Sequence, residues 1–399
     1  MVALDEIAMS VVIPVRNDGQ FLENVLTEIN NQKVLPIEIV IIDSSANEGV
    51  KRFVKAYGGT APIIYHHEKK AYPGRARNSG VNLASSEWIA FLDCKTVPER
   101  DWLERYQYLI QAYHADVVFG VTKFDAASPF QKALRAATYG KIGHHTVPGT
   151  LIKKNVFTDS GGFLEHVRMG EDIEWRERLI KNGFNIHTPD EPVVTYNGLP
   201  DSFVSTLRKY LKSAYHTARL NIMSNVKNTY LSLALILSAI ILPKWNHIIG
   251  RWDANPLFIP HVTKIYLLAL VCLFLIYQLM HYLFFRNMSQ TLFFRTIKLM
   301  VIGFISMAVY KWNAVIAEWM EDAVFYVPHI TKMYVGGLIL ASIFYRGIFL
   351  PIRREVEPRF LFPVKWINVG MLGLSLDLLK APGYVLGAVI SIFLRLTRE

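Results

Sequence analysis

Long apolar runs in the second half of the chain constrain its fold more than any other feature. From about Thr229 onward they occupy residues 229–242, 265–285, 299–310, 333–351 and, with interruptions, 366–396. A helix needs about 20 apolar residues to cross a bilayer. The preceding residues instead mix charged and apolar side chains as globular domains do. The pattern predicts a globular N-terminal domain over residues 1–202 and a helical membrane domain over residues 229–399.

A tandem repeat organises the apolar half. Residues 244–266 and 311–334 both contain Lys-Trp-Asn and Pro-His-x-Thr-Lys. Two repeat units, about 229–290 and 297–355, share one orientation if each crosses the bilayer twice. The first run of each unit is short for a full span, so interfacial or re-entrant placement stays open.

The last apolar segment, residues 366–396, is interrupted by Asp377, Lys380 and Pro382. It is expected to form either a hairpin or a single kinked span. Asp377 and Lys380 are three positions apart, so they face the same side of a helix and can pair. Such a pair marks either a site inside the membrane or the tip of an interfacial hairpin.

The topology is expected to leave the N-terminal domain in the cytosol. Predicted loops on its side of the membrane carry eight Lys and Arg residues, against five on the other side. The first residues lack the basic start of a signal peptide. We therefore expect an integral membrane protein, with the plasma membrane as its location.

Residues 203–228 join the two parts and contain five basic residues and no acidic one. Apolar residues are interleaved with the basic ones, which predicts basic amphipathic helices at the membrane interface. The alternative is a solvated helix of the globular domain.

The net charge of +10 indicates an anionic partner. No zinc spacing or RNA-binding motif is present, so nucleic acid is not expected. Anionic lipid head groups and nucleotide diphosphates fit the apolar half better. The two cysteines, Cys94 and Cys272, are far apart in sequence, and a disulfide is not expected.

The N-terminal domain alternates apolar strands with helical patterns. Residues 10–15, 38–43, 62–67 and 88–93 read as buried strands, with helices over 18–31, 47–57 and 74–84. Uninterrupted apolar strands are typical of a parallel sheet that helices cover on both faces. The fold class is therefore α/β, a doubly wound domain that binds ligands beyond the carboxyl ends of its strands.

Four segments, in order, resemble the family-2 glycosyltransferases of the GT-A fold. They are VVIPVRN, EIVIIDSSANEG, GRARNSGVNLASSEWIAFLDCKTVP and VPGTLIKKNVFTDSGGFLEHVRMGEDIEW. The resemblance covers about residues 9–200. It implies an inverting transfer of a sugar from a nucleotide-sugar donor.

The resemblance also implies which residues meet the donor. These are Pro14, Val15, Arg16, Asp43, Arg77, Asn78, Asp93 and Lys95. Asp43 is expected to accept a hydrogen bond from the base, with turn capping as the alternative. Arg77 suits charge-assisted contact with a diphosphate.

Asp93 stands where the family commonly has Asp-x-Asp, a motif that holds Mg²⁺ or Mn²⁺ against the diphosphate. The tripeptide here is Asp93-Cys94-Lys95, so the second carboxylate is replaced by a cation. A divalent metal on Asp93 is still expected, either assisted or partly replaced by Lys95.

Asp172 is the expected catalytic base, with Glu171 as the second choice. Both residues open a helix, where the helix dipole favours an ionised carboxylate. A carboxylate beside an acceptor hydroxyl can take its proton. The alternative is that both residues only cap the helix. Gly149, His145 and Trp175 are expected on the acceptor side, although Trp175 is equally suited to the core.

The expected function is transfer of a sugar to a hydroxyl of a lipid or lipid-linked acceptor at the cytosolic membrane face. The Gln-x-x-Arg-Trp motif of processive relatives is absent, which argues against polymer export. Two alternatives stay open: a polyprenyl-phosphate glycosyltransferase, and an inactive sugar-binding scaffold. A transporter is disfavoured because the apolar runs contain few ionisable residues.

Overall fold

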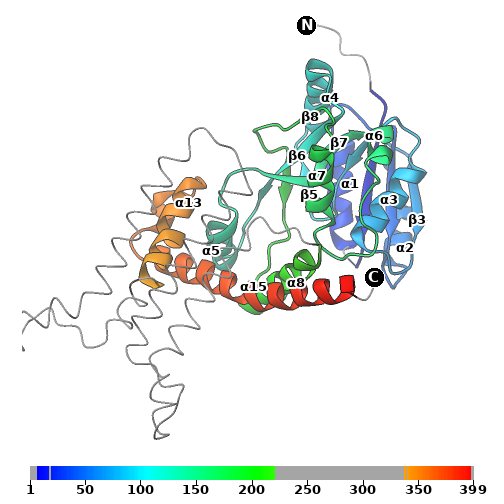
Figure 1. Cartoon of the computed structure of the whole chain (residues 1–399). Coiled ribbons are helices and arrows are strands. Elements are labelled where there is room, and N and C mark those ends of the chain that lie inside the picture. The colour runs from blue at the N-terminus through cyan, green and yellow to red at the C-terminus, as the bar shows by residue number, and fades with distance from the viewer. Residues whose placement is uncertain (1–6, 18, 221–336, 338, 397–399) are drawn as a thin grey trace, which may run out of the picture. The chain divides into compact units, whose positions relative to one another are not determined.

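The computed structural model describes residues 7–17, 19–220, 337 and 339–396 (Figure 1). The chain divides into two units, one formed by Met1–Tyr230 with Ser342–Glu399 and the other by Leu231–Ala341. The second unit lies almost wholly outside the described residues. The first unit differs from the predicted division at residue 229, because residues 342–399 group with the N-terminal domain.

A mixed sheet forms the centre of the first unit, and nine strands belong to it in the described part of the chain. They are β1 (Met9–Val15), β2 (Glu38–Asp43), β3 (Ile63–His67), β4 (Trp88–Phe91), β5 (Thr96–Pro98), β6 (Val117–Phe124), β7 (His144–Lys153), β8 (Ile186–His187) and β9 (Val194–Tyr196). Their order is β3-β2-β1-β4-β7-β6-β9-β5, and β8 pairs with β6.

The four predicted strands are confirmed, and β1 pairs in parallel with both β2 and β4. The other half of the sheet differs from the doubly wound expectation, since β7 runs antiparallel to both β4 and β6. This half of the sheet was not predicted, because its strands pair with partners that are distant in sequence. No local pattern specifies such pairing.

Helices surround the sheet and continue into the C-terminal segment. They are η1 (Gly19–Phe21), α1 (Leu22–Asn30), α2 (Gly49–Ala56), α3 (Pro73–Leu83), α4 (Trp102–Tyr113), α5 (Pro129–Thr138), α6 (Lys154–Asp159), α7 (Glu171–Lys181), α8 (Phe203–Arg219), the π-helical turn η2 (Tyr345–Phe349), α13 (Leu350–Arg353), α14 (Pro358–Leu361) and α15 (Lys365–Leu396).

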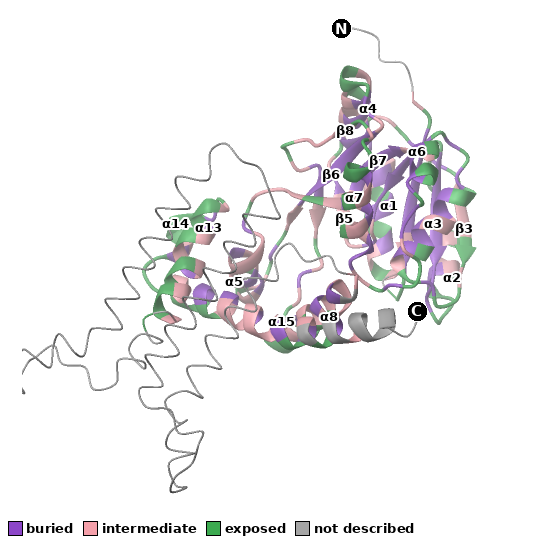
Figure 2. Cartoon of the chain, in the orientation of Figure 1, coloured by how far each residue is buried: buried purple, intermediate pink, exposed green. Residues whose placement is uncertain are grey.

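Two apolar clusters explain why β1 and β2 are apolar without interruption. Val11 and Ile13 pack with α1 and α4 on one face of the sheet, whereas Val12 packs with α3 and α7 on the other. Successive side chains of a strand point to opposite faces, so both sets of positions are buried. Figure 2 shows the central strands as continuously buried.

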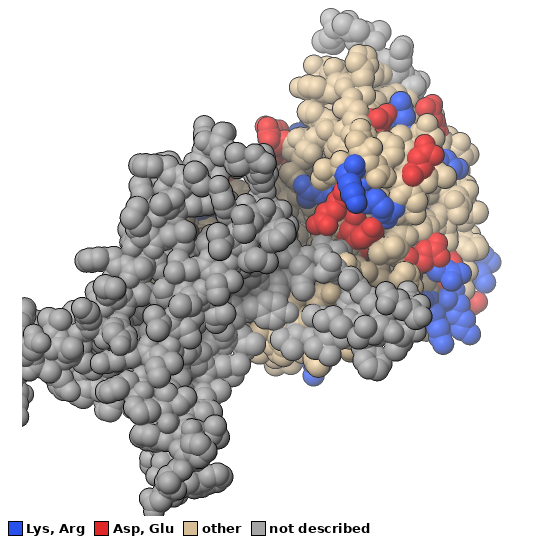
Figure 3. Space-filling view, in the orientation of Figure 1, with Lys and Arg blue, Asp and Glu red and all other residues tan. Residues whose placement is uncertain are grey.

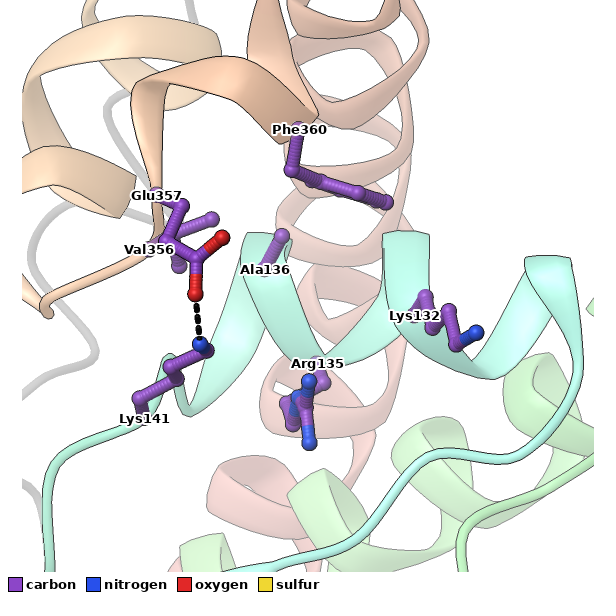
Figure 4. A pocket seen from close by; sticks show the side chains of 7 residues that line it. All are labelled: Lys132, Arg135, Ala136, Lys141, Val356, Glu357 and Phe360. Carbon is purple, nitrogen blue, oxygen red and sulfur yellow. Dashed lines mark hydrogen bonds and ion pairs between the residues drawn. The ribbon is translucent and has the colours of Figure 1, made fainter.

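The C-terminal segment packs on the N-terminal domain through α5 and α8. Leu361 and Val369 are buried together with Ala136 of α5. A cavity of about 140 Å³ lies at this contact, and Lys141 forms an ion pair with Glu357 at its edge (Figure 4). The contact therefore combines an apolar centre with a charged rim.

Helix α15 lies against α8 at close range. A Cβ atom added to Gly387 would come within 2.4 Å of the Tyr215 carbonyl oxygen, and one added to Gly383 within 2.6 Å of the Leu211 carbonyl oxygen. The two glycines therefore let the helix backbones approach more closely than any larger residue would allow.

The structure corrects one prediction for the apolar half, the one for residues 366–396. Most of the other predictions for this half concern residues that the structure does not describe. Residues 366–396 form one helix with Pro382 inside it, so the hairpin alternative is wrong. No helix among the described residues is long and apolar enough to span a bilayer. Asp377 and Lys380 do pair, at 3.3 Å. The tandem repeat and its predicted crossings lie almost entirely within residues 221–336, outside the described part.

Charge is interspersed on the visible face of the N-terminal domain. Figure 3 shows acidic and basic side chains next to one another there, with no wide surface of a single sign. The net positive charge of the chain is therefore not gathered on this face into a broad basic surface.

Candidate active site

A pocket of about 350 Å³ opens at the carboxyl ends of β1, β2 and β4. Six of its lining residues were predicted to meet the donor, namely Pro14, Val15, Arg16, Arg77, Asp93 and Lys95. Seven others were missed, namely Ser44, Ala71, Pro73, Ala76, Cys94, Met169 and Tyr196. Ligands of open α/β sheets bind at this edge, so the fold and the predicted residues indicate the same site.

Arg77 organises the base of this pocket. It lies on α3, and Pro73 at the start of that helix suits the first turn because proline has no N–H to satisfy there. The guanidinium is buried and donates to Asp93 at 2.8 Å and to Glu171 at 3.0 Å. One arginine therefore joins the loop after β4 to the N-terminus of α7, and this links the pocket to the predicted base.

Glu171 is held inside this network. Its side chain is 6% exposed, and Arg77 donates to Oε1, while Oε2 makes no hydrogen bond. The pKa of Glu171 is raised to about 7, chiefly by burial and next by the charge of the neighbouring Asp172, against the pull of Arg77. A carboxylate that is enclosed and paired in this way is poorly placed to receive a proton from a substrate.

Asp172 is the more accessible member of the pair. It is partly exposed in the first turn of α7, next to Glu171, and its charge also acts on Arg77. Met169, three positions earlier, lines the pocket. The structure therefore favours Asp172 over Glu171 as the group that faces a substrate.

Asp43 is placed differently from its prediction. Its carboxylate is fully buried, and it accepts hydrogen bonds from the Ser45 amide at 2.8 Å and from the Tyr65 hydroxyl at 2.9 Å. Asp43 therefore caps a turn, which was the alternative to base contact. Ser44, the next residue, lines the pocket instead.

Asn78 also has a structural role and does not line the pocket. Its side-chain amide donates to the Phe163 carbonyl oxygen and to Glu165, and its oxygen accepts from the Phe163 amide at 2.9 Å. Asn78 thus fixes the loop before α7 to α3. These hydrogen bonds occupy the Asn78 side chain that was predicted to contact the donor.

Two of the three predicted acceptor-side residues are structural. Trp175 is fully buried among Phe91, Phe119 and Phe163, so it belongs to the core. Gly149 is buried in β7, where its carbonyl oxygen accepts from the Trp102 indole at 2.9 Å. Neither residue reaches a surface that an acceptor could contact.

His145 is the exception, because it is exposed on β7. Its Nδ1 lies 2.9 Å from an Arg176 nitrogen on α7, and partial burial of the ring together with the Arg176 charge lowers the pKa of the imidazole. The imidazole of His145 therefore lies beside α7, the helix that carries Asp172. This position is consistent with an acceptor contact.

The side chains at Asp93 do not fit a divalent cation well. Among the described residues, no three His, Cys, Asp or Glu side chains converge to hold a metal. Asp93 accepts from Arg77, and the residue two positions later is Lys95. Mg²⁺ and Mn²⁺ require several oxygen ligands, so this donor set disagrees with the metal expected from the sequence.

Comparison with known proteins supports the same reading of the N-terminal domain. Residues 10–168 match the family described as glycosyl transferase family 2. The glycosyltransferase AglE of Haloferax volcanii is 24% identical over 259 residues, covering 61% of this chain and 84% of that protein. The pre-mycofactocin glycosyltransferase of Mycobacterium tuberculosis is 27% identical over 191 residues, covering 44% of this chain and 39% of that protein.

These matches identify the chain as a glycosyltransferase enzyme. Residues 10–168 are similar to the family 2 glycosyltransferases, and the described N-terminal domain is built on a mixed α/β sheet. The crystal structure of S. aureus TarS 1-349 in complex with UDP-GlcNAc has a TM-score of 0.42 at 18% identity, covering 53% of this chain and 65% of that one. A likeness this low carries no weight for donor or acceptor.

Proposed function

We propose that the enzyme transfers a sugar, with inversion, from a nucleotide-sugar donor to a hydroxyl of a lipid or lipid-linked acceptor at the cytosolic face of a membrane. The observation that carries the catalytic part of this proposal is the buried Arg77, which joins Asp93 at the pocket to Glu171 at the start of α7. This network joins the pocket to the first turn of α7, where the neighbouring Asp172 is partly exposed.

The proposed reaction is a single displacement. The acceptor hydroxyl oxygen attacks the anomeric carbon while the bond from that carbon to the diphosphate oxygen breaks. The electron pair of that bond stays on the diphosphate, and Asp172 takes the hydroxyl proton. Because one substitution occurs at the anomeric carbon and no enzyme nucleophile is required, the configuration inverts.

Positive charge near the pocket supports the donor part of the proposal. Arg16 and Lys95 line the pocket together with Arg77. A nucleoside diphosphate is an anion that guanidinium and ammonium groups bind by charge-assisted hydrogen bonds. Pro14 and Val15, at the end of β1, supply backbone walls for the nucleoside.

The acceptor part rests on the sequence. The apolar runs between residues 229 and 342 and the basic, acid-free segment 203–228 fit a protein that works at a membrane surface. Exposed Phe203 and Val204 at the start of α8 extend that pattern. Holding the acceptor at the surface would convert a search in solution into a positioned encounter.

Transfer assays test the proposal directly. The full-length chain in detergent is incubated with radiolabelled UDP-, GDP- and dTDP-sugars and a membrane lipid extract. We expect label in a lipid product whose linkage survives mild acid. An acid-labile sugar-phospholipid would instead show a polyprenyl-phosphate acceptor. Absence of both transfer and donor hydrolysis with every sugar would contradict the proposal and favour the scaffold alternative.

A further inference from the structure

The contact between His145 and Arg176 has no part in the reaction as described so far. His145 lies on β7 and Arg176 on α7, and Nδ1 of His145 is 2.9 Å from a guanidinium nitrogen of Arg176. Arg176 follows Asp172 by four positions, so the two residues share one face of α7, about 6 Å apart along the helix axis. The contact therefore lies one helical turn beyond the expected catalytic base, on the same face of the helix.

The pleat of β7 explains why His145 faces α7. Successive residues of a strand point to opposite faces of the sheet. His144 packs edge-on against the rings of Phe124 and Tyr139, and its Nε2 lies 2.7 Å from the Tyr139 carbonyl oxygen. His145 consequently lies on the other face, where it meets Arg176.

Arg176 is held in place from its other side. Its guanidinium carbon lies 5.4 Å from the centre of the Phe119 ring. Phe119 is buried, and its ring meets the buried Trp175 ring edge-on. The guanidinium is thus restrained between a core aromatic ring and His145, which gives the contact a defined geometry.

This contact determines where the imidazole of His145 carries its proton. A guanidinium group has N–H donors and no acceptor, so Nδ1 must accept this hydrogen bond. A nitrogen that accepts carries no proton, and the ring then holds its proton on Nε2. Partial burial and next the charge of Arg176 lower the pKa of His145, in agreement with this state. Because His145 is exposed, a substrate can reach the ring.

We propose that the Nε2–H group of His145 donates a hydrogen bond to a second oxygen of the acceptor, beside the hydroxyl that Asp172 deprotonates, and that Arg176 is the positioning residue that fixes this tautomer. A sugar of a lipid-linked glycan carries such an oxygen next to the attacked hydroxyl. The hydrogen bond orients that hydroxyl toward the anomeric carbon. This inference rests on the proposed function, since it assumes an acceptor hydroxyl at Asp172.

Transfer kinetics test the acceptor contact. The full-length chain in detergent transfers label from a saturating nucleotide sugar to varied amounts of membrane lipid extract. His145→Ala and Arg176→Met should each raise the apparent KM for the extract by roughly 3- to 10-fold, the equivalent of one hydrogen bond. Arg176→Lys, which still has a donor for Nδ1, should return the apparent KM close to the wild-type value. Donor hydrolysis without extract should not change, because water needs no contact with His145.

Two matched controls accompany these variants. His66→Ala removes an exposed histidine from β3, and Lys181→Met removes an exposed cation from the end of α7. Both should leave the apparent KM unchanged. Equal losses of transfer and donor hydrolysis in His145→Ala would show a structural role and overturn the inference. An unchanged apparent KM in His145→Ala would overturn it as well.

Magnetic resonance of isotope-labelled imidazole nitrogens measures the tautomer without any substrate. The signal that disappears in His145→Ala belongs to His145. We expect its proton on Nε2 in the wild type, a mixture of both tautomers in Arg176→Met, and recovery in Arg176→Lys. A wild-type ring with its proton on Nδ1, or an unchanged signal in Arg176→Met, would overturn the role of Arg176.

Failure of the proposed function gives a different result. A wild-type chain that neither transfers label nor hydrolyses any donor would contradict the proposed function, and the acceptor contact would fail with it. Wild-type transfer that is insensitive to His145→Ala would instead overturn only this inference.

Discussion

At the scale of single residues, adjacent Glu171 and Asp172 have different environments. Glu171 is enclosed and bonded to Arg77, whereas Asp172 is partly exposed on the same turn. The sequence motif presents both as candidate bases. The tertiary contacts of Arg77 distinguish them, because they occupy one carboxylate and leave its neighbour available.

Asp172→Asn is expected to lower the turnover number of sugar transfer by about 10²- to 10⁴-fold, the usual contribution of a general base. Nucleoside diphosphate affinity should stay within a few-fold, since Asp172 does not line the donor pocket. Steady-state transfer kinetics and calorimetry measure the two quantities. If Glu171→Gln abolishes turnover and Asp172→Asn does not, the roles are reversed.

Glu171 makes stability depend on pH. Its folded-state pKa of about 7 lies above the ordinary value of 4.5. The resulting stabilisation is complete below the unfolded value and is lost as pH rises through about 7. Between about pH 5 and about pH 8, the wild type should lose on the order of 2 kcal/mol of unfolding free energy relative to Glu171→Gln.

Denaturant unfolding of both proteins across this pH range measures the effect. Glu171→Gln cannot ionise at this position, so its own stability should vary less over the same window. Parallel pH profiles for the two proteins would show that Glu171 ionises at its ordinary pKa.

At the scale of elements, the contact between α8 and α15 depends on small residues. Residues 366–396 were expected to form either a hairpin or a single kinked span, because a Pro-Gly pair within an apolar segment resembles a turn. The structure instead has one long helix whose Gly383 and Gly387 meet the α8 backbone. A close helix partner thus accounts for glycine at these two positions.

Gly387→Val should loosen this contact, because its side chain would overlap the Tyr215 carbonyl oxygen and the Ala218 methyl group. Overpacking of this kind costs about 1–3 kcal/mol. Hydrogen exchange of residues 203–219 should accelerate accordingly. Gly58→Ala, where a Cβ meets nothing within 4 Å, is the control and should leave exchange in that helix unchanged.

At the scale of the whole molecule, the C-terminal segment is a part of the N-terminal unit. Residues 342–399 group with residues 1–230 across more than a hundred intervening positions. Arg346 bonds to Asp377 within the segment, and the Lys141 amide donates to the Arg354 carbonyl oxygen across it. Chain connectivity alone would have assigned the segment to the apolar half, as the sequence analysis did.

Leu361→Ala tests this arrangement, because Leu361 is fully buried and belongs to the same cluster as Ala136. Removing a buried leucine side chain costs about 2–5 kcal/mol. The unfolding temperature of the N-terminal domain should fall, as followed by loss of nucleotide binding on heating. Ile352→Ala, at a residue 45% exposed, should change it little. Equal behaviour of both variants would show that the segment does not stabilise the domain.

The sequence by itself determined the α/β class, the strands β1 to β4 and the segment that carries Arg77, Asp93 and Asp172. Local patterns in the sequence specify those features: apolar runs, helix starts and short motifs at strand ends. Tertiary structure alone decided that Asp43, Asn78 and Trp175 serve the framework, and that β7 pairs antiparallel to β4. It also placed His145 beside Arg176, 31 positions later in the chain. Contacts of this range depend on which surfaces meet after folding, and no local pattern encodes them.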